Sequence, residues 1–395
     1  MAITDKEEGV WSLDEVYNKQ NQGGIWNYSS NKYALKMAGQ NAIGWAGAAG
    51  VLGLNDNINR SSPTQVGTDT TWEKIHTGSN AYNAMLASKS DNTLWTWGIG
   101  NLGRNDTIWR SSPVQLPGTN WDGFLSYSMR TKMASRNSGQ LWVWGNNQMG
   151  QLGVNYINPA PQGISSPIQL PGTWSDGNAG DYAMYAIKGG GLYAWGGHYN
   201  SSLGLNEGYG YDKSSPTQVG TDTNWAKVGK GVFRTVAAIK TDGTLWAWGG
   251  AARKFINSTP TGKMSSPIQI PGTTWSEVSC ADEGVIYGIK TDGSLWSATN
   301  STGNDAGQLG HNDRTAYSSP KQIPGTWASV HPYYRSVAAI KTDGTLWSWG
   351  YNASGRLGHN NNTLYSSPTQ IPGYYNTNGY GAGGSINYIA ALEAI

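Results

Sequence analysis

The chain repeats one short segment, Ser-Ser-Pro-x-Gln, seven times along its 395 residues. The copies begin at Ser61, Ser111, Ser165, Ser214, Ser265, Ser318 and Ser366, so the successive spacings are 50, 54, 49, 51, 53 and 48 residues. A period of this size is typical of propellers and solenoids, in which each unit buries its apolar face only against its neighbours. We therefore interpret the chain as one array of seven units and not as two or three separate domains.

The unit itself is best read in residues 337–373. Residues 337–341 are small and β-prone, Asp343-Gly344 is a strong hairpin signal, and residues 345–349 form the return strand with its two tryptophans on one face. The Ser-Ser-Pro segment reads as another extended piece. A further tryptophan follows the next turn, at Trp72, Trp121, Trp174, Trp225, Trp275 and Trp327. Four short strands and no helix per unit predict an all-β, seven-bladed β-propeller, with an open β-solenoid as the alternative.

Both ends of the chain offer strands for closing such a ring. Residues 385–392 resemble the small-residue strand, and we expect the return strand that they lack in residues 41–45 at the other end. Closure by strands from both termini would remove the exposed edges of an open array. Residues 33–36 also look like a small-residue strand, which makes eight candidates for seven blades. One terminal copy is therefore expected to lie outside the standard pattern.

The composition excludes several classes of function. Charged residues make up only 13% of the chain and the net charge is +2 without a basic block, so nothing indicates nucleic-acid binding. Cys280 is the sole cysteine, which excludes an internal disulfide framework and a cysteine-rich metal site. No run of eighteen apolar residues predicts a membrane span, and the polar N-terminus does not read as a signal peptide.

No constellation in the sequence predicts catalysis. We find no carboxylate pair, nucleophile–base pair or phosphate loop, and therefore expect a non-enzyme with no catalytic residue, cofactor or metal. The G-x-G-x-x-G match at residues 98–103 is the repeat's own turn without a following helix. The repeated glutamines are read as partners of backbone groups, with a ring of ligand-binding amides as the alternative: Gln65, Gln115, Gln169, Gln218, Gln269, Gln322 and Gln370.

Residues that break the repeat are the better functional candidates. They lie in the variable loops before each Ser-Ser-Pro segment, which share one repeat position and should gather on one face. Aromatic and arginine side chains on loops are typical of recognition surfaces, while ordinary loop variation is the alternative. The candidate recognition residues are Trp109, Tyr156, Tyr209, Tyr211, Arg253 and Lys254.

The motifs Leu-Trp-x-Trp-Gly, Gly-Gln-Leu-Gly and Ser-Ser-Pro-x-Gln-Ile-Pro-Gly together resemble the repeat of the regulator of chromosome condensation family. The resemblance covers residues 31–395 and is specific for the fold. It is closer to the degenerate bacterial and viral branch than to the eukaryotic nucleotide-exchange factor. Exchange activity in that relative depends on acidic surface residues and a protruding hairpin, which this sequence does not show, and fold alone does not carry function.

The first thirty residues carry a second resemblance. Residues 9–26 are similar to a "GVWSL" segment of marine bacteriophage virion proteins. Ser12 and Glu15 form a capping box that predicts a helix over residues 13–21, so we assign residues 1–30 to an N-terminal arm. Its candidate anchor residues are Trp11, Leu13, Tyr17 and Trp26; a helix packed on its own propeller is the alternative.

This second resemblance implies a non-enzymatic structural protein of the phage virion, assembled in the host cytoplasm. The arm would bind other virion proteins, and the propeller would act as a fibre, decoration or host-binding module that contacts a host-surface receptor. A homo-oligomer is compatible with this interpretation. The alternative is a bacterial protein-binding or inhibitor propeller built from the same repeat.

Overall fold

The computed structural model describes residues 32–41, 50–76, 84–128, 131–158, 163–180, 182–198, 202–207, 210–230, 235–250, 264–281, 284–299, 303–378, 381–384 and 388–395. Several sequence predictions fall outside these residues. They are the helix over residues 13–21, the anchor residues Trp11, Leu13, Tyr17 and Trp26, and the loop residues Tyr209, Arg253 and Lys254.

The described residues form short strands and one 3-10 helix, Ala353–Gly355. The first strands along the chain are β1 (Tyr33–Gly39), β2 (Arg60–Gln65), β3 (Trp72–His76), β4 (Ala84–Lys89), β5 (Leu94–Gly98), β6 (Arg110–Gln115), β7 (Leu125–Tyr127), β8 (Thr131–Arg136), β9 (Gln140–Gly145) and β10 (Ile164–Thr173). The middle strands are β11 (Asp176–Ala179), β12 (Ala183–Lys188), β13 (Gly191–Gly196), β14 (Lys213–Gln218), β15 (Trp225–Val228), β16 (Thr235–Lys240), β17 (Leu245–Gly249) and β18 (Met264–Ile270). The last are β19 (Trp275–Ala281), β20 (Val285–Lys290), β21 (Ser294–Thr299), β22 (Lys321–Tyr333), β23 (Ser336–Lys341), β24 (Thr345–Gly350), β25 (Tyr365–Tyr374), β26 (Ala382–Gly384) and β27 (Tyr388–Ala394).

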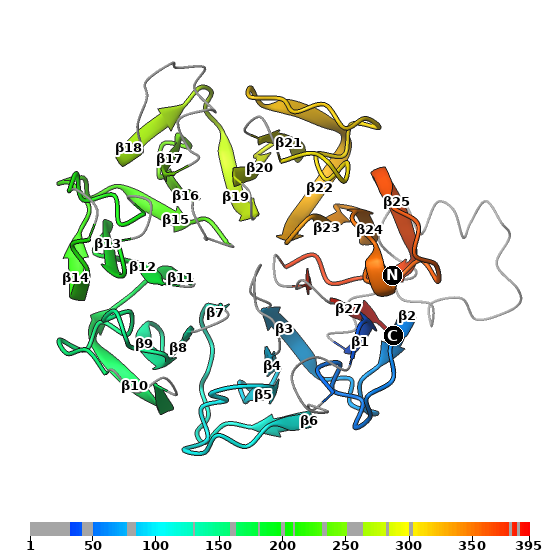
Figure 1. Ribbon diagram of the computed structural model, residues 1–395, viewed down its shortest axis with the longest axis horizontal. Coiled ribbons are helices and arrows are strands. Elements are labelled where there is room, and N and C mark those ends of the chain that lie inside the picture. The colour runs from blue at the N-terminus through cyan, green and yellow to red at the C-terminus, as the bar shows by residue number, and fades with distance from the viewer. Residues whose placement is uncertain are drawn as a thin grey trace, which may run out of the picture.

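These strands form radial sheets around a central axis, as Figure 1 shows. Consecutive strands pair antiparallel in groups of four, such as β3 to β6 and β11 to β14. The long strand β22 belongs to two groups, since residues 321–326 pair with β21 and residues 327–333 pair with β23. Within the described residues the strands thus fall into seven four-stranded blades. The predicted all-β propeller is confirmed, and the open solenoid is not what the chain forms.

The blade that closes the ring is shared between the two ends of the chain. Its strand order is β2-β1-β27-β26, with β1 and β27 paired along their whole length from Tyr33↔Ala394 to Gly39↔Tyr388. The C-terminal segment therefore supplies the small-residue strand, as expected. The prediction that residues 41–45 form the return strand is wrong: β1 occupies that place, Asn41 lies outside any strand, and residues 42–45 lie outside the described part.

Strand register explains this correction. In the other blades the return strand pairs with the outermost strand at the glutamine of Ser-Ser-Pro-x-Gln, for example Trp347↔Gln370. In the closing blade the partner of Gln65 is Lys36 of β1. Both terminal candidates, β1 and β27, are thus used in one blade, as third and second strand. The eight small-residue candidates therefore fit seven blades, because a small-residue sequence can form either the second or the third strand of a blade.

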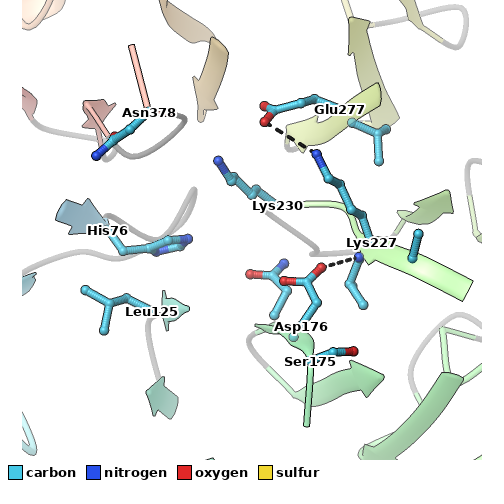
Figure 2. Close-up of a pocket in the computed structure, with 13 residues that line it drawn as sticks. His76, Leu125, Ser175, Asp176, Lys227, Lys230, Glu277 and Asn378 are labelled. Carbon is cyan, nitrogen blue, oxygen red and sulfur yellow. Dashed lines mark hydrogen bonds and ion pairs between the residues drawn. The ribbon is translucent and has the colours of Figure 1, made fainter. Parts of the chain in front are cut away.

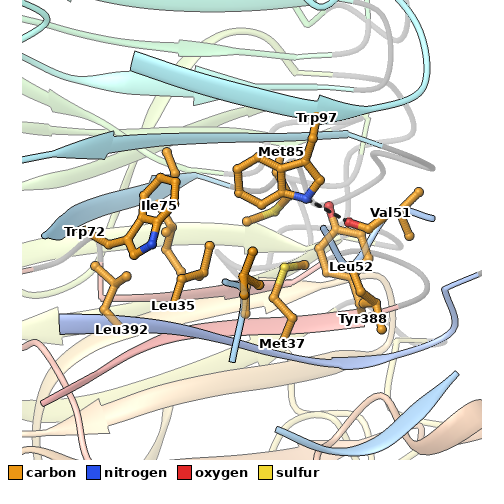
Figure 3. Packing of buried hydrophobic residues seen from close by; sticks show 13 residues of the cluster. Leu35, Met37, Val51, Leu52, Trp72, Ile75, Met85, Trp97, Tyr388 and Leu392 are labelled. Atoms are coloured by element: carbon orange, nitrogen blue, oxygen red, sulfur yellow. Dashed lines mark hydrogen bonds between the residues drawn. The ribbon is translucent and has the colours of Figure 1, made fainter. Parts of the chain in front are cut away.

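An apolar cluster joins the closing blade to the next blade. Figure 3 shows Leu35 of β1 and Leu392 of β27 packed with Trp72 of β3. Tyr388 is fully buried in this cluster, and its hydroxyl donates to the carbonyl of Ala84 at 2.8 Å. Residues more than 300 positions apart in the sequence therefore share one core, which fastens the ring.

The Thr-Asp-Gly-Thr turns organise the tryptophans of each blade. The carboxylate of Asp343 accepts hydrogen bonds from the backbone N–H and the hydroxyl of Thr345, and this hydroxyl accepts from Trp347 Nε1 at 2.9 Å. The Lys341 amino group lies 3.9 Å from the Trp347 ring centroid, a cation–π contact. The same turn recurs at Asp91, Asp242 and Asp292. The first tryptophan of each pair thus serves its own blade.

The second tryptophan of the pair makes the contact between blades. Trp97 is fully buried, and its Nε1 donates to the carbonyl of Val51 in the preceding loop at 3.0 Å. Gly103 has φ +83°, and a Cβ there would lie 3.1 Å from Trp144 Nε1 of the following blade. The Leu-Gly turn therefore needs glycine to admit the next tryptophan. The second tryptophan therefore packs between two blades.

A recurrent backbone hydrogen bond links the loop of one blade to the outermost strand of the next. An asparagine two residues after the glycine of the Leu-Gly turn adopts a left-handed conformation, as at Asn105 with φ 59°. Its N–H donates to the carbonyl of Ser165 in the next blade at 2.9 Å. The equivalent pairs are Asn55–Ser111, Asn155–Ser214, Asn206–Ser265, Asn312–Ser366 and Asn360–Ser61. The last pair crosses the closing seam, so ring closure uses the same contact as every other described junction of this type.

Candidate functional site

The loops that break the repeat emerge on one face of the propeller. Because consecutive strands in a blade are antiparallel, every connection from the third to the fourth strand lies at the same end, opposite the Asp-Gly hairpins. Trp109, Tyr156 and Tyr211 lie in these connections with 44%, 48% and 62% of their surface exposed. The structure thus places all three described candidates in solvent, on three consecutive blades.

Two further exposed residues in these loops escaped the sequence analysis. Ile58 and Ile108 are 63% and 59% exposed. Each follows an aspartate by two residues and precedes an arginine by two, in the pattern Asp-x-Ile-x-Arg. This repeated pattern could have indicated the two isoleucines in the sequence, but the prediction was based on aromatic and arginine side chains and so omitted them. Ile157, 52% exposed beside Tyr156, belongs to the same set.

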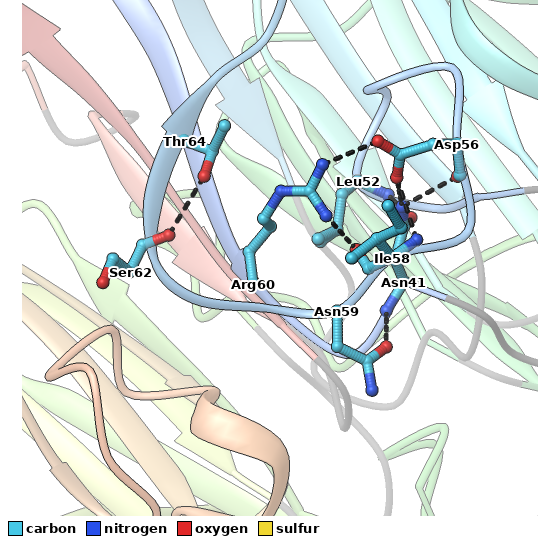
Figure 4. Close-up of polar contacts among 8 residues, drawn as sticks. All are labelled: Asn41, Leu52, Asp56, Ile58, Asn59, Arg60, Ser62 and Thr64. Atoms are coloured by element: carbon cyan, nitrogen blue, oxygen red, sulfur yellow. Dashed lines mark hydrogen bonds and ion pairs between the residues drawn. The ribbon is translucent and has the colours of Figure 1, made fainter.

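These isoleucines stand on braced turns. The Asp56 carboxylate accepts from the backbone N–H of Ile58 at 2.9 Å and pairs with Arg60 at 2.6 Å, as Figure 4 shows. Partial burial opposes ionisation of Asp56, but these hydrogen bonds and the arginine charge lower its pKa overall. Asp106 makes the same contacts with Ile108 and Arg110, at 3.0 and 3.1 Å. These contacts therefore fix the conformation of both turns, in which the isoleucine side chain points into solvent.

Most of the large exposed apolar residues in the described loops of this face occupy one sector of the rim. Ile58, Ile108 with Trp109, Tyr156 with Ile157, and Tyr211 come from the loops of four consecutive blades. Across the ring, Tyr351 is 36% exposed, and Tyr317 and Tyr365, which precede Ser-Ser-Pro as Arg60 and Arg110 do, are partly buried against the imidazoles of His311 and His359. We call Ile58, Ile108, Trp109, Tyr156, Ile157 and Tyr211 the apolar rim.

A second feature lies on the axis. One position of the innermost strands, opposite residues such as Leu86 and Tyr287 of the second strands, places one residue from each blade at the axis. Reading round the ring, this position holds His76, Ser126, Asn178, Gly229, Ser279, His331 and Gly383. Asn178 Nδ2 donates to the Gly229 carbonyl at 2.8 Å, and Ser279 Oγ donates to the Val330 carbonyl at 3.1 Å. Polar contacts thus run from blade to blade around the axis.

The axial ring borders a cavity of about 310 Å³. Figure 2 shows side chains from separate blades around it, among them His76, Asp176 and Lys230. Asp176 Oδ2 accepts from the backbone N–H of Val228 at 2.7 Å. Lys227 and Glu277 form an ion pair at 3.8 Å, with side chains 51% and 25% exposed. The cavity therefore combines buried polar groups with a charged border that reaches solvent.

Burial sets the titration of the axial groups. It lowers the pKa of His76 to about 3, and the nearby Lys230 charge acts in the same direction. Burial, Lys230 and His76 together hold the pKa of His331 well below its usual value. Burial also raises the pKa of the Asp176 carboxyl to about 6, against the opposing effect of its hydrogen bonds and the lysines. At neutral pH the axis therefore carries two neutral imidazoles beside an ammonium group.

Other sites offer less chemistry. Cys280 is buried, and burial raises the pKa of its thiol to about 12, so the thiolate is scarce at neutral pH. Among the described residues, no group of three histidine, cysteine, aspartate or glutamate side chains is placed to hold a metal ion. No helix in the described part of the chain is long and apolar enough to cross a membrane.

The fold and the repeat together define a β-propeller of four-stranded blades built on a tryptophan-rich repeat. Residues 138–184 and 343–378 match the family model for the regulator of chromosome condensation (RCC1) repeat. The chain thus contains repeats of this kind, as the motifs predicted. No curated protein sequence matches the chain.

Solved structures of the same architecture cover most of the chain. Human WBSCR16 is 18% identical, with a TM-score of 0.73 over 91% of this chain and 98% of that one. Prp20p from Saccharomyces cerevisiae, in a structure described with its binding to Gsp1p and histones, is 16% identical, with a TM-score of 0.73 over 93% and 92%. Yeast RCC1 (Prp20), in a structure with Kap60 bound to it, is 16% identical, with a TM-score of 0.72 over 92% of this chain and 89% of that one. At these identities the likeness shows an RCC1-like propeller fold.

Proposed function

We propose that this protein is a non-enzymatic, protein-binding propeller that recognises its partner through the apolar rim. The observation that supports this most strongly is that Ile58 and Ile108, next to Trp109, are exposed on turns fixed by hydrogen bonds to an aspartate. Large apolar side chains gathered in one sector and held in a fixed conformation are typical of protein interfaces. Little conformational entropy would be lost on binding, since the aspartate–arginine braces already order the turns.

The RCC1 repeats agree with this proposal. The structure of Prp20p, which has the same fold, is described with binding to Gsp1p and histones, so a propeller of this kind can serve as a binding platform. Nothing in the rim resembles a catalytic constellation, because its charged residues pair with one another, as Asp106 does with Arg110. The centre of the predicted interface is the pair Ile108 and Trp109.

The test compares two variants of equal charge change. Ile108→Asp places a carboxylate in the apolar rim, while Asn362→Asp places one in the exposed loop across the ring. The full-length chain and both variants are immobilised and exposed to extract of the source cells, and the captured proteins are quantified. Each candidate partner is then purified and titrated against the three chains.

We expect the partner to bind the wild type and Asn362→Asp alike, and Ile108→Asp at least tenfold more weakly, since a hot-spot residue carries about 2 kcal/mol. A purified partner that binds Ile108→Asp as tightly as the wild type would place the interface elsewhere and refute the rim assignment. Circular dichroism and the unfolding midpoint of each variant show that the propeller is intact.

The virion role remains a prediction of the N-terminal resemblance, because residues 1–31 lie outside the described part. It is compatible with a binding propeller, which would then face a host receptor. Imaging or mass spectrometry of purified source particles tests it: a protein consistently missing from the particles has no virion role.

A further inference from the structure

The axial cavity suggests a ligand site that is independent of the apolar rim. Its lining residues are spread along the innermost strands: Asp176 begins β11, His76 ends β3 and Lys230 follows the end of β15. The rim loops instead lead into the outermost strands of the blades. The cavity and the apolar rim are therefore separated by the radial width of the blades and can be tested one at a time.

Lys230 is positioned on the axis by its backbone. It follows β15, and its N–H donates to the Val278 carbonyl at 3.2 Å while its carbonyl accepts from the Cys280 N–H at 2.7 Å. These bonds fix the residue between two blades. The neighbouring Gly229 is closely packed, since a Cβ there would lie 2.9 Å from the Ala237 carbonyl oxygen and 3.1 Å from Val278 Cγ1. Figure 2 shows the Lys230 side chain reaching across the cavity toward the side of His76 and Asn378.

The groups around Lys230 can donate hydrogen bonds to an anion. His76 lines the cavity, and His331 lies at the same level of the axial ring, where its Nε2 is 3.0 Å from Ser329 Oγ. Each neutral imidazole offers one N–H, depending on its tautomer, and gains a second on protonation. Asn378 also lines the cavity, where its Nδ2 donates to the Glu73 carbonyl at 3.1 Å. An ammonium group and imidazoles beside one cavity are donors that bind carboxylate and phosphate oxygens.

The cavity also holds groups that oppose an anion. Glu277 is engaged by Lys227 at 3.8 Å, so its charge is partly compensated. Asp176 is the remaining carboxylate; it lines the cavity with Lys227 and Lys230 and accepts hydrogen bonds from the backbone N–H groups of Val228 and Gly177. An incoming anion would compete with Asp176 for the lysine charge. Protonation of this carboxyl would remove the competition.

We propose that the axial cavity binds a small oxyanion, carried by a phosphate or a carboxylate, between Lys230 and the His76 imidazole, with His331 on the axial ring beside them. Its volume of about 310 Å³ accommodates a compact ligand and not a folded chain. Lys230 supplies the charge, His76 and His331 supply directed N–H groups, and Asp176 sets the pH range. The site belongs to what breaks the repeat, because no two adjacent blades bring the same residue to the axial ring.

The experiment titrates the full-length chain with sodium sulfate, inorganic phosphate and sodium succinate, each at constant ionic strength against sodium chloride. Binding is followed by calorimetry and by nitrogen NMR of the five histidines, with His76→Gln and His331→Gln to assign the signals. Phosphate without succinate binding identifies a tetrahedral anion, and the reverse identifies a carboxylate. Sulfate does not titrate between pH 5 and 8 and serves for the pH dependence.

Two substitutions should act in opposite directions. Lys230→Met should weaken binding by at least about tenfold, because it removes the charge, and Lys230→Arg should retain most of it. Asp176→Asn should tighten binding several-fold at pH 7 and reduce the gain that the wild type shows as the pH falls from 7 to 5, leaving only the part that comes from proton uptake by the imidazoles. Lys74→Met is the control, since the Lys74 amino group is bonded to the Asp122 carbonyl at 2.8 Å, outside the cavity lining.

The NMR signals of the imidazoles distinguish anion binding from a purely structural role of Lys230 or Asp176, which would not make these signals respond to added anion. A bound oxyanion should raise the pKa of His76 and His331, because its charge favours the imidazolium form. The proposal is overturned if none of the three anions shifts these signals beyond the chloride control. It is also overturned if Lys230→Met binds like Lys74→Met, or if Asp176→Asn weakens binding while remaining folded.

Discussion

Leu392 is the residue at which the closing seam can be tested most directly. It is fully buried in the cluster that joins β1 and β27 to the next blade. Leu392→Ala removes about three methylene equivalents, worth ~2.4 kcal/mol of transfer free energy at ~0.8 kcal/mol each. The cavity left behind adds to this, so we expect a loss of about 3 to 4 kcal/mol in the free energy of unfolding.

A matched residue separates loss of packing from opening of the seam. Ile289 occupies the corresponding position of β20, in a blade whose strands are continuous along the chain, and it is 2% exposed. Ile289→Ala should cost a similar free energy. Only Leu392→Ala should also let β27 separate from β1, because the closing blade holds its C-terminal strands by non-covalent contacts alone.

The assay combines urea unfolding with hydrogen exchange followed by mass spectrometry. In Leu392→Ala, amides of residues 33–39 and 388–394 should exchange faster at urea concentrations where the remaining blades stay protected. In Ile289→Ala no region should be selectively released. Equal protection of the seam peptides in both variants would refute the idea that the closing blade is the weakest junction.

Two further predictions concern stability. Asn105→Ala should lower the free energy of unfolding by about 1 to 2 kcal/mol, because it loses the serine contact and forces alanine to φ 59°, whereas Asn105→Gly should recover part of this loss in the same urea titration. The buried neutral His76 should contribute a loss of stability as the pH drops from about 6.5 toward 4 in a chloride buffer, since its pKa of about 3 in the folded chain lies below its unfolded value and only the unfolded chain takes up the proton. Asp176, whose pKa burial raises to about 6, acts in the opposite direction over the same range. His76→Gln should reduce this slope; an unchanged slope would show that the imidazole is not buried in its neutral form.

Much of the fold could be predicted from local pattern. The Thr-Asp-Gly-Thr turn at residues 342–345 predicts a hairpin because its aspartate and threonine satisfy backbone groups within four residues. The tryptophans predict packing because nothing else in the repeat is large enough to fill a blade. The place of β1 could not be predicted in this way, because its small residues fit the second or the third strand of a blade equally well. Only its pairing with Gln65 of β2 and with β27 shows that it is the third strand.

The candidate sites divide in the same way. Trp109, Tyr156 and Tyr211 were found from the sequence because bulky residues in a variable loop depart from the repeat, whereas the exposed Ile58 and Ile108 needed coordinates. The axial groups carried no sequence signal. His76, Lys230 and His331 lie in three different repeats, and none stands near another in the chain.

The sequence by itself determined the blade, since each repeat encodes its own turns, its tryptophan layer and its Ser-Ser-Pro outer strand through contacts between residues close in the chain. The tertiary structure alone decided how the ends meet and what the axis contains. Closure brings Tyr388 to Ala84, and the radial arrangement brings one residue from each blade to a common centre. Such convergence depends on the angle between blades, which many weak contacts set together and which no single repeat records.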